Sequence, residues 1–116
     1  MLDFISDGYT QQGYIAQVTG LHGALSFEFR PILAEERAVY YSPKTQALPA
    51  DQQEKAACKL LAAKLASWTL VDAAGACVPI NAENVSRVRP ALQGKLWRIV
   101  AGLDPTESTE EADLKN

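Results

Sequence analysis

Reactive and metal-binding side chains are scarce in this chain of 116 residues, which has two cysteines and one histidine. Structural zinc sites normally use four Cys or His ligands, so this set does not indicate one. We therefore expect Cys58 and Cys77 to be free thiols, buried or half-buried, with a disulfide or a metal site as the alternative. His22 has no adjacent Cys, Ser or Asp with which to form a nucleophilic pair, and we expect it to face solvent in a turn.

The chain also lacks a basic excess. Its net charge is −3, and the acidity is concentrated at the end, where residues 104–116 carry five acidic residues against one lysine. Residues 1–103 hold ten Lys and Arg against nine Asp and Glu and are therefore almost neutral. Proteins that bind nucleic acid usually gather a basic excess on one face, so nucleic acid is not an expected partner.

Long apolar runs are missing as well. Residues 1–8 have neither a positive region nor a long apolar core, so they do not indicate a secretory signal. No apolar stretch approaches the ~20 residues that a membrane helix needs. These patterns predict a cytosolic protein with no membrane contact.

The overall composition is that of a folded domain. Hydrophobic residues make up 47% of the chain and charged residues 22%, both near the average for globular proteins. The length suits one domain. We expect a flexible N-terminal arm over residues 1–12, a single domain over 13–103 and an acidic disordered tail over 104–116.

The N-terminal half of this domain predicts a β-hairpin followed by helices. Alternating residues indicate strands at about 14–19 and 24–30, with Tyr14, Ala16 and Val18 on one face and a glycine-bounded turn between the strands. Pro31 ends the second strand because proline has no N–H to donate. A short helix is expected over 32–41, then a loop, then the strongest helix at roughly 50–68.

The C-terminal half predicts two more helices. Residues 68–80 read as two extended pieces around Gly75, which would form either a small second hairpin or an ordered loop. Asn81 is a credible N-cap for a helix to about Arg89, and a helix over 91–101 would end at Gly102. The predicted class is α+β, an N-terminal β-hairpin followed by a small helical domain of about four helices.

No arrangement of side chains indicates catalysis, a metal or a cofactor. Candidate residues for partner binding are two adjacent tyrosines near a helix end, two residues of an apolar stripe and one arginine, namely Tyr40, Tyr41, Leu92, Leu96 and Arg98. The stripe could instead belong to the core of the domain. Arg87, Arg89, Lys95 and Arg98 form a basic set that suits a solvated face, an acidic partner or the protein's own tail.

Two stretches of the sequence resemble the tail assembly chaperones of long-tailed bacteriophages and prophages. The first runs from Gly20 through Phe27-Glu28-Phe29-Arg30-Pro31 to Glu35-Glu36-Arg37. The second runs from Trp68 through Gly75, Val78-Pro79-Ile80 and Glu83-Asn84-Val85 to Leu96-Trp97. Together they cover about residues 14–103.

The resemblance implies a non-enzymatic protein of the host bacterial cytoplasm. It would bind the long helical tape measure protein, keep it soluble and help to recruit tail-tube subunits, and it could also self-associate. An apolar groove between helices would suit this role. The alanine-rich helix over 50–68 and the stripe of Leu92, Leu96, Ile99 and Val100 could form such a groove, or they could be the domain's own core. The alternatives are a small structural tail or head-tail connector protein of the virion and, less favoured by the neutral domain, a small regulator that binds nucleic acid.

Overall fold

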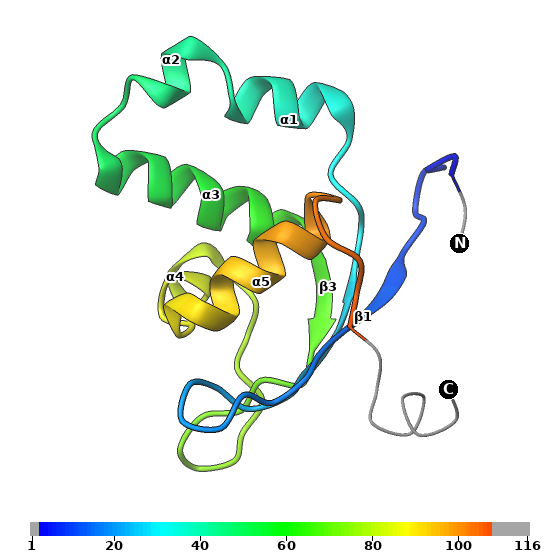
Figure 1. The fold of residues 1–116 in the computed structure, drawn as a ribbon, viewed down its shortest axis with the longest axis vertical. Coiled ribbons are helices and arrows are strands. Elements are labelled where there is room, and N and C mark those ends of the chain that lie inside the picture. The colour runs from blue at the N-terminus through cyan, green and yellow to red at the C-terminus, as the bar shows by residue number, and fades with distance from the viewer. Residues whose placement is uncertain (1–2, 108–116) are drawn as a thin grey trace.

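The structure is a computed structural model that describes residues 3–107. Three strands form one antiparallel sheet in the order β1-β2-β3, and helices precede and follow β3 (Figure 1). The elements are β1 (Gln11–Ile15), β2 (Leu25–Phe29), α1 (Ala34–Tyr40), α2 (Pro43–Gln46), α3 (Ala50–Lys64), β3 (Leu65–Trp68), α4 (Ala82–Ser86) and α5 (Pro90–Val100). The predicted α+β class with an N-terminal hairpin is confirmed, and α2 is an additional single turn.

The hairpin has the predicted partners but a different first strand. Strand β2 alternates as expected, with Phe27 and Phe29 buried and Ser26 exposed. Strand β1 begins at Gln11 and ends at Ile15, so the predicted bounds of about 14–19 were wrong. Ile15 is fully buried, while Tyr14 and Ala16 lie on the other side of the strand.

A β-bulge explains why the long helix was predicted to continue to residue 68. Helix α3 ends at Lys64, and Leu65 to Trp68 form β3 against β2. Phe29 pairs with Leu65 and Phe27 with Trp68, so the three residues 27–29 on β2 oppose the four residues 65–68 on β3. The bulge turns Leu65 and Trp68 to the same side with a spacing of three, which is also the spacing of one helix face.

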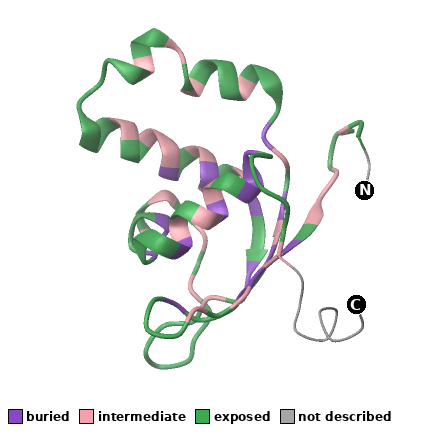
Figure 2. Cartoon of the chain, in the orientation of Figure 1, coloured by how far each residue is buried: buried purple, intermediate pink, exposed green. Residues whose placement is uncertain are grey.

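The hydrophobic core lies between the sheet and the helices α3, α4 and α5. Its buried residues come mainly from β2, β3, α3 and α5, as Figure 2 shows in purple. Pro90 begins α5, and Gly102, at φ +77°, follows its C-cap, as predicted. Asn81 caps α4 as predicted by accepting the Asn84 N–H at 2.8 Å, although this helix ends at Ser86 rather than near Arg89.

Residues 69–80 form an ordered loop with a single bridge between Val71 and Cys77. The indole Nε1–H of Trp68 donates to the Val78 carbonyl at 2.7 Å and ties this loop to the sheet. The segment combines the two predicted alternatives, because it is a loop without strands whose arms pair as in a minimal hairpin: the Asp72 N–H donates to the Ala76 carbonyl and the Val78 N–H to the Leu70 carbonyl. Both cysteines are free thiols, and Cys77 is exposed rather than buried.

Residues 104–107, here called the C-terminal strap, run beside β1. The Glu107 N–H donates to the Tyr14 carbonyl at 2.9 Å, and the Tyr14 N–H donates to the Thr106 hydroxyl at 2.6 Å. The Ala16 N–H donates to the Glu107 carboxylate at 2.8 Å. Thr106 and Glu107 of the predicted tail are therefore hydrogen-bonded to the edge of the sheet rather than disordered. The rest of that tail, 108–116, lies outside the described residues.

Within residues 3–107, every helix is too short or too polar to cross a lipid bilayer.

Candidate functional site

Helices α1 and α2 form an arm that lies outside the core. Neither helix contains a buried residue, whereas α3, α4 and α5 all do (Figure 2). Val39 is 70% exposed and Tyr41 is 46% exposed, so α1 leaves large apolar side chains in contact with water. A seven-residue helix is too short to be stable alone, and contacts at its ends must hold it in place.

The first anchor of the arm is at the end of α3. The Lys64 ammonium lies 2.6 Å from the Glu36 carboxylate, and the Lys64 carbonyl accepts the Arg30 N–H at 2.8 Å. Glu36 also accepts the Leu33 N–H at 2.9 Å, which caps the start of α1. Burial by itself raises the pKa of the Glu36 carboxyl, but the hydrogen bonds from Lys64 and Leu33 and the Lys64 charge outweigh it and lower that pKa.

The second anchor is near the start of α3. The side-chain amide of Gln53 donates to the carbonyls of Gln46 and Leu48, each at 2.8 Å. This side chain therefore holds the chain where α2 turns back into α3. The arm is attached at both ends, and the space between its middle and α3 is not filled by side chains of the core.

Tyr40 is the contact between the middle of the arm and the helical layer. Its ring centroid lies 4.7 Å from that of Trp97 on α5 and 4.9 Å from that of Tyr41. Burial, followed by the nearby Tyr41 and Cys58 groups, raises the pKa of the Tyr40 hydroxyl, which keeps it neutral. Tyr40 thus divides the space under the arm into two hollows on opposite sides of the molecule.

The larger hollow, which we call the arm groove, has a volume of about 400 Å³. Its walls are one face of α1 and one face of α3, with a contribution from α2: Glu36, Val39, Tyr40, Thr45, Ala56, Lys59, Leu60 and Ala63. Residues 56, 59, 60 and 63 share one helix face. At 1.5 Å per residue this face is ~10 Å long, about two helical turns.

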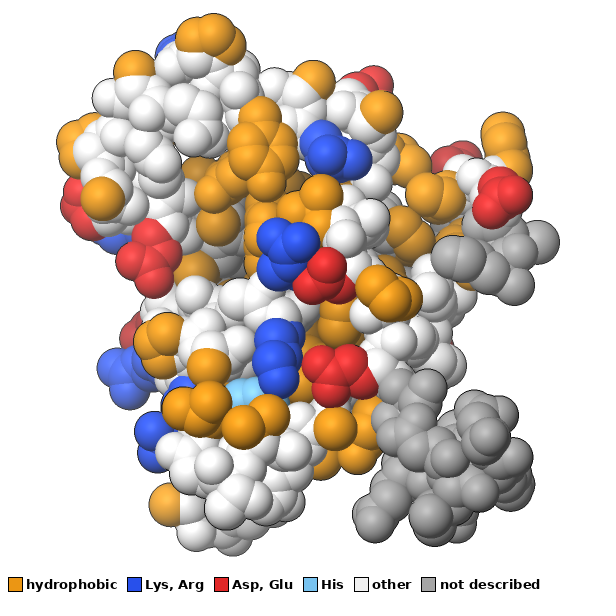
Figure 3. All heavy atoms as spheres, in the orientation of Figure 1, with side chains coloured by type: hydrophobic (Ala, Val, Ile, Leu, Met, Phe, Trp, Pro, Cys, Tyr) orange, Lys and Arg blue, Asp and Glu red, His pale blue; other side chains and the backbone are white. Residues whose placement is uncertain are grey.

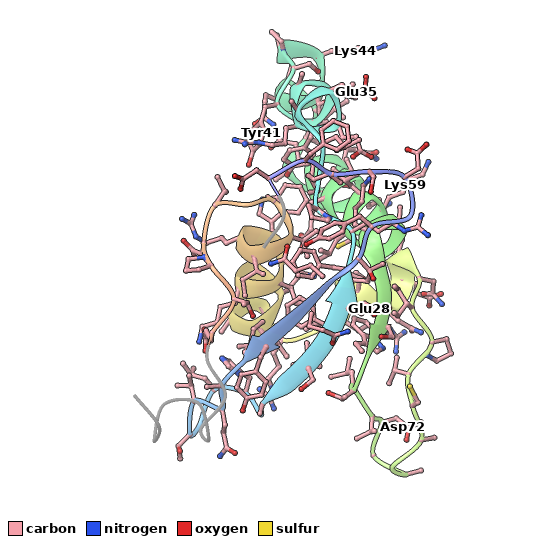
Figure 4. The ribbon with its side chains drawn as sticks, turned by 90° about the vertical axis from the view of Figure 1, so that its right-hand side faces the viewer. Glu28, Glu35, Tyr41, Lys44, Lys59 and Asp72 are labelled. Carbon is pink, nitrogen blue, oxygen red and sulfur yellow. The ribbon has the colours of Figure 1, made fainter. Side chains whose placement is uncertain are left out.

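The smaller hollow has a volume of about 210 Å³ and lies between α1, α3 and α5, with Trp97 and Gly94 in its wall. The two hollows use different faces of α3, since residues 56, 59, 60 and 63 line the arm groove and residues 57, 58 and 61 line the smaller hollow. Figure 4 shows Lys59, at the arm groove, and Tyr41 pointing to opposite sides of the molecule. Figure 3 shows apolar side chains gathered between the arm and α5 on the face of Tyr41.

The structure brings together only some of the residues predicted to bind a partner. Tyr40 lines both hollows, and Tyr41 is exposed beside it. Leu92 and Leu96 are 5% and 0% exposed, so these two belong to the core, which was the alternative interpretation of their stripe. Arg98 is exposed and donates to Asp104 through two nitrogens, at 2.7 and 3.1 Å, and this contact raises the pKa of Arg98 and lowers that of Asp104.

The helix predicted over 50–68 was a candidate wall of the groove, and its residues 56, 59, 60 and 63 line the arm groove, whereas Val39 opposite it was not predicted. The sequence feature that indicates this wall is the spacing of Ala56, Leu60 and Ala63, which places small and medium apolar side chains on one face of the helix. The same pattern suits a packed interface inside the domain, and only the position of the arm distinguishes the two.

His22 also differs from its predicted position in a solvent-facing turn. It is 8% exposed rather than facing solvent, and its Nδ1 lies 2.9 Å from the Gly23 carbonyl. Its Nε2 lies 3.3 Å from the Lys95 ammonium. The tight loop closed by the bridge between Val18 and His22 folds the imidazole onto α5, which alternation in the sequence does not reveal.

The residues that the structure describes contain no cluster of three or more His, Cys, Asp or Glu side chains that could hold a metal ion. Comparison of the chain with known protein families, with curated protein sequences and with solved structures found no match. The site is therefore interpreted from its geometry and from the sequence resemblance alone.

Proposed function

We propose that this chain is a phage tail assembly chaperone that binds the tape measure protein in the arm groove. The observation that carries the proposal is the groove itself: an apolar channel about two helical turns long, beneath an arm with no buried residue of its own. Amphipathic helices bind in such grooves through residues spaced three and four apart.

The residues that carry the sequence resemblance support the proposal because several of them build the arm and its anchor. Phe27 and Phe29 are buried in β2, and Arg30 and Pro31 lead from that strand toward α1. Glu36 is the side chain that ties α1 to Lys64. The motif thus falls where the arm joins the domain.

The groove sets the kind of helix that it accepts. Val39, Leu60 and the alanine methyl groups offer apolar contact, so the bound helix needs an apolar stripe. Lys59 is exposed at the rim, which favours an acidic residue beside that stripe. One groove covers about two turns, so a long tape measure helix would take many copies of the chaperone along its length.

The proposed protein is non-enzymatic and works in the host bacterial cytoplasm. Once the tape measure is covered, the chaperone helps to recruit tail-tube subunits, as the resemblance implies. Copies that bind next to one another along the helix could also contact each other.

Co-expression tests this proposal. The chain is produced with and without the tape measure protein of the same phage, and the soluble fraction and the co-purified complex are measured. We expect the chain to make the tape measure soluble and to co-purify with it. A tape measure that stays insoluble and never co-purifies would refute the proposal.

A matched pair of variants locates the binding site. Val39→Glu places a charge in the groove at a position that is 70% exposed, and Leu21→Glu makes the same kind of change in the β1–β2 turn at 54% exposure. We expect the first to lose the complex and the second to keep it. Equal loss with both variants would contradict the assignment of the groove.

Mass spectrometry of purified particles separates the proposal from a structural role. A chaperone leaves before the virion is complete, whereas a tail or connector protein would be present in every particle.

A further inference from the structure

A further hollow, larger than the arm groove, lies at the other end of the molecule. It has a volume of about 520 Å³, which is within the usual range of ligand pockets. Its walls come from the loop 69–80, from the turn at His22 and Gly23, and from residues 84–92, which include the end of α4, the link between the helices and the start of α5. We call it the loop pocket.

Hydrogen bonds hold the walls of the loop pocket in place. Val78 is fixed by the Trp68 indole at 2.7 Å and by its own N–H, which donates to the Leu70 carbonyl at 3.0 Å. The Asn84 side chain donates to the Pro79 carbonyl at 2.8 Å and joins the loop to α4. The pocket is thus formed before any ligand arrives, which lowers the entropic cost of binding.

The ion pairs of the chain leave positive charge at this pocket. Of the four basic residues in the predicted set, Lys95 lies 3.8 Å from Glu107, and Arg98 lies 2.7 Å from Asp104. The C-terminal strap therefore pairs with the two that do not line the pocket, although Lys95 also contacts the pocket residue His22. The other two, Arg87 and Arg89, line the pocket.

The charges of these two arginines are only weakly balanced. Arg87 is 3.9 Å from Glu83, and both side chains are almost 80% exposed, so this pair contributes little. Within residues 3–107, Arg89 makes no ion pair. Asp72 is the acidic residue of the pocket, and its Oδ1 accepts the N–H groups of Ala74 and Ala76 at 2.9 and 3.0 Å. Its negative charge offsets one of the two arginines, so the lining keeps a positive excess.

Most of the remaining lining is apolar, with His22 and Asn84 as its polar side chains. Leu70 and Val78 are half-buried, and Val88 and Leu92 are 7% and 5% exposed at the base of the pocket. Figure 3 shows the histidine, in pale blue, among basic and apolar side chains on this part of the surface. A ligand must therefore combine an apolar group with negative charge.

We propose that the loop pocket binds a short acidic peptide segment of a partner protein, with an apolar side chain on Val78 and Val88 and flanking carboxylates on Arg87 and Arg89. Carboxylates pair well with arginine because both groups are planar and can form two parallel hydrogen bonds. A nucleic-acid strand suits the pocket less well, since two arginines beside an apolar floor track few phosphates. This site is separate from the arm groove and does not depend on the proposed function.

Titration of the ¹⁵N-labelled full chain tests the proposal by NMR. The probes are the blocked tetrapeptide acetyl-Glu-Leu-Phe-Glu-amide, its neutral analogue acetyl-Gln-Leu-Phe-Gln-amide and a short single-stranded DNA. We expect millimolar binding of the acidic peptide, with shifts confined to amides of residues 70–79 and 84–89. The neutral peptide should bind roughly fivefold more weakly, because exposed ion pairs contribute little each.

Variants then test the two arginines. The double variant Arg87→Gln and Arg89→Gln should bind the acidic peptide no better than the wild type binds the neutral one. The control, Arg37→Gln with Lys44→Gln, removes the same charge from the arm and should bind as the wild type does. The comparison of the two peptides on the wild-type chain holds even if a variant fails to fold.

Three results would overturn the proposal. The first is an absence of shifts at millimolar acidic peptide, or shifts that lie elsewhere. The second is equal affinity for the two peptides, which would make the pocket merely apolar. The third is stronger binding of the DNA at the same amides.

Discussion

Replacing Glu36 with alanine should release the arm without unfolding the domain. The substitution removes the carboxylate that accepts the Leu33 N–H and pairs with Lys64 at 2.6 Å. Loss of the cap costs about 1 kcal/mol, and loss of a charged hydrogen bond costs roughly 1.5–3 kcal/mol when the groups are partly buried. The Glu36 and Lys64 side chains are 28% and 14% exposed, so water partly screens their interaction and lowers its contribution. We therefore expect a total loss of about 2–3 kcal/mol, at the low end of the combined range.

That loss should stay local because α1 contributes no buried residue to the core. Hydrogen exchange followed by NMR or mass spectrometry measures it: amides of α1 should lose up to roughly 100-fold in protection, since 1.4 kcal/mol corresponds to a factor of ten. Amides of α3, α5 and the sheet should keep their rates.

Glu35→Ala is the matched control. Glu35 is the preceding residue on the same helix, is exposed and makes no ion pair within residues 3–107 (Figure 4). It should leave the exchange of α1 almost unchanged. If both variants have the same effect, or if Glu36→Ala speeds exchange equally in α1 and in the sheet, the arm is not an independent unit held by Glu36.

The same contact gives the arm a pH dependence with a definite sign. The pKa of Glu36 is lowered in the folded protein, so its stabilisation is present above the usual value of 4.5 and is lost as the pH falls through the folded pKa. After correction for the intrinsic pH dependence of exchange, the protection of the α1 amides should stay constant from neutral pH down to 4.5 and should fall below that pH. In Glu36→Ala this acid-dependent loosening should be absent.

Two further predictions concern the sheet and the thiols. Gly13→Ala should destabilise the domain by about 1–3 kcal/mol, because a Cβ at Gly13 would clash with the buried Phe27 ring; an unchanged midpoint in chemical denaturation would contradict this. A thiol reagent should label exposed Cys77 quickly in the native protein and Cys58 only on unfolding, since burial and the Glu54 charge raise the pKa of Cys58; equal native rates would show that Cys58 is accessible.

The elements that the sequence predicts well are those with a local cause. Strand β2 alternates cleanly and stops before Pro31, and α5 begins at Pro90 and is followed by Gly102 with a positive φ. Each signal acts within a few residues, so no knowledge of distant contacts is needed.

The errors arise where a distant contact decides between two local patterns. Residues 65–68 continue the spacing of α3, but pairing with β2 draws them into a bulged strand. In β1 the alternation of Tyr14 and Ala16 competes with that of Gly13 and Ile15, and the space needed by the Phe27 ring selects the second.

The candidate site was predictable only in part for the same reason. An apolar stripe such as Leu92 and Leu96 has the same spacing whether it meets its own domain or a partner. The arm groove depends on how far α1 stands from α3, which the contacts of Lys64 and Gln53 determine. The ion pair of Lys64 with Glu36 joins residues that are far apart in the sequence, and neither set of contacts leaves a periodic signal.

The C-terminal strap also bears on how the protein should be shortened for experiments. Strand β1 is at the edge of the sheet, and residues 106 and 107 occupy the N–H and C=O of Tyr14 and the N–H of Ala16 on its outer side. A chain cut after Leu103 would leave these groups open to pair with a strand of another molecule, which is a common route to aggregation. A truncated form should therefore extend at least through Glu107.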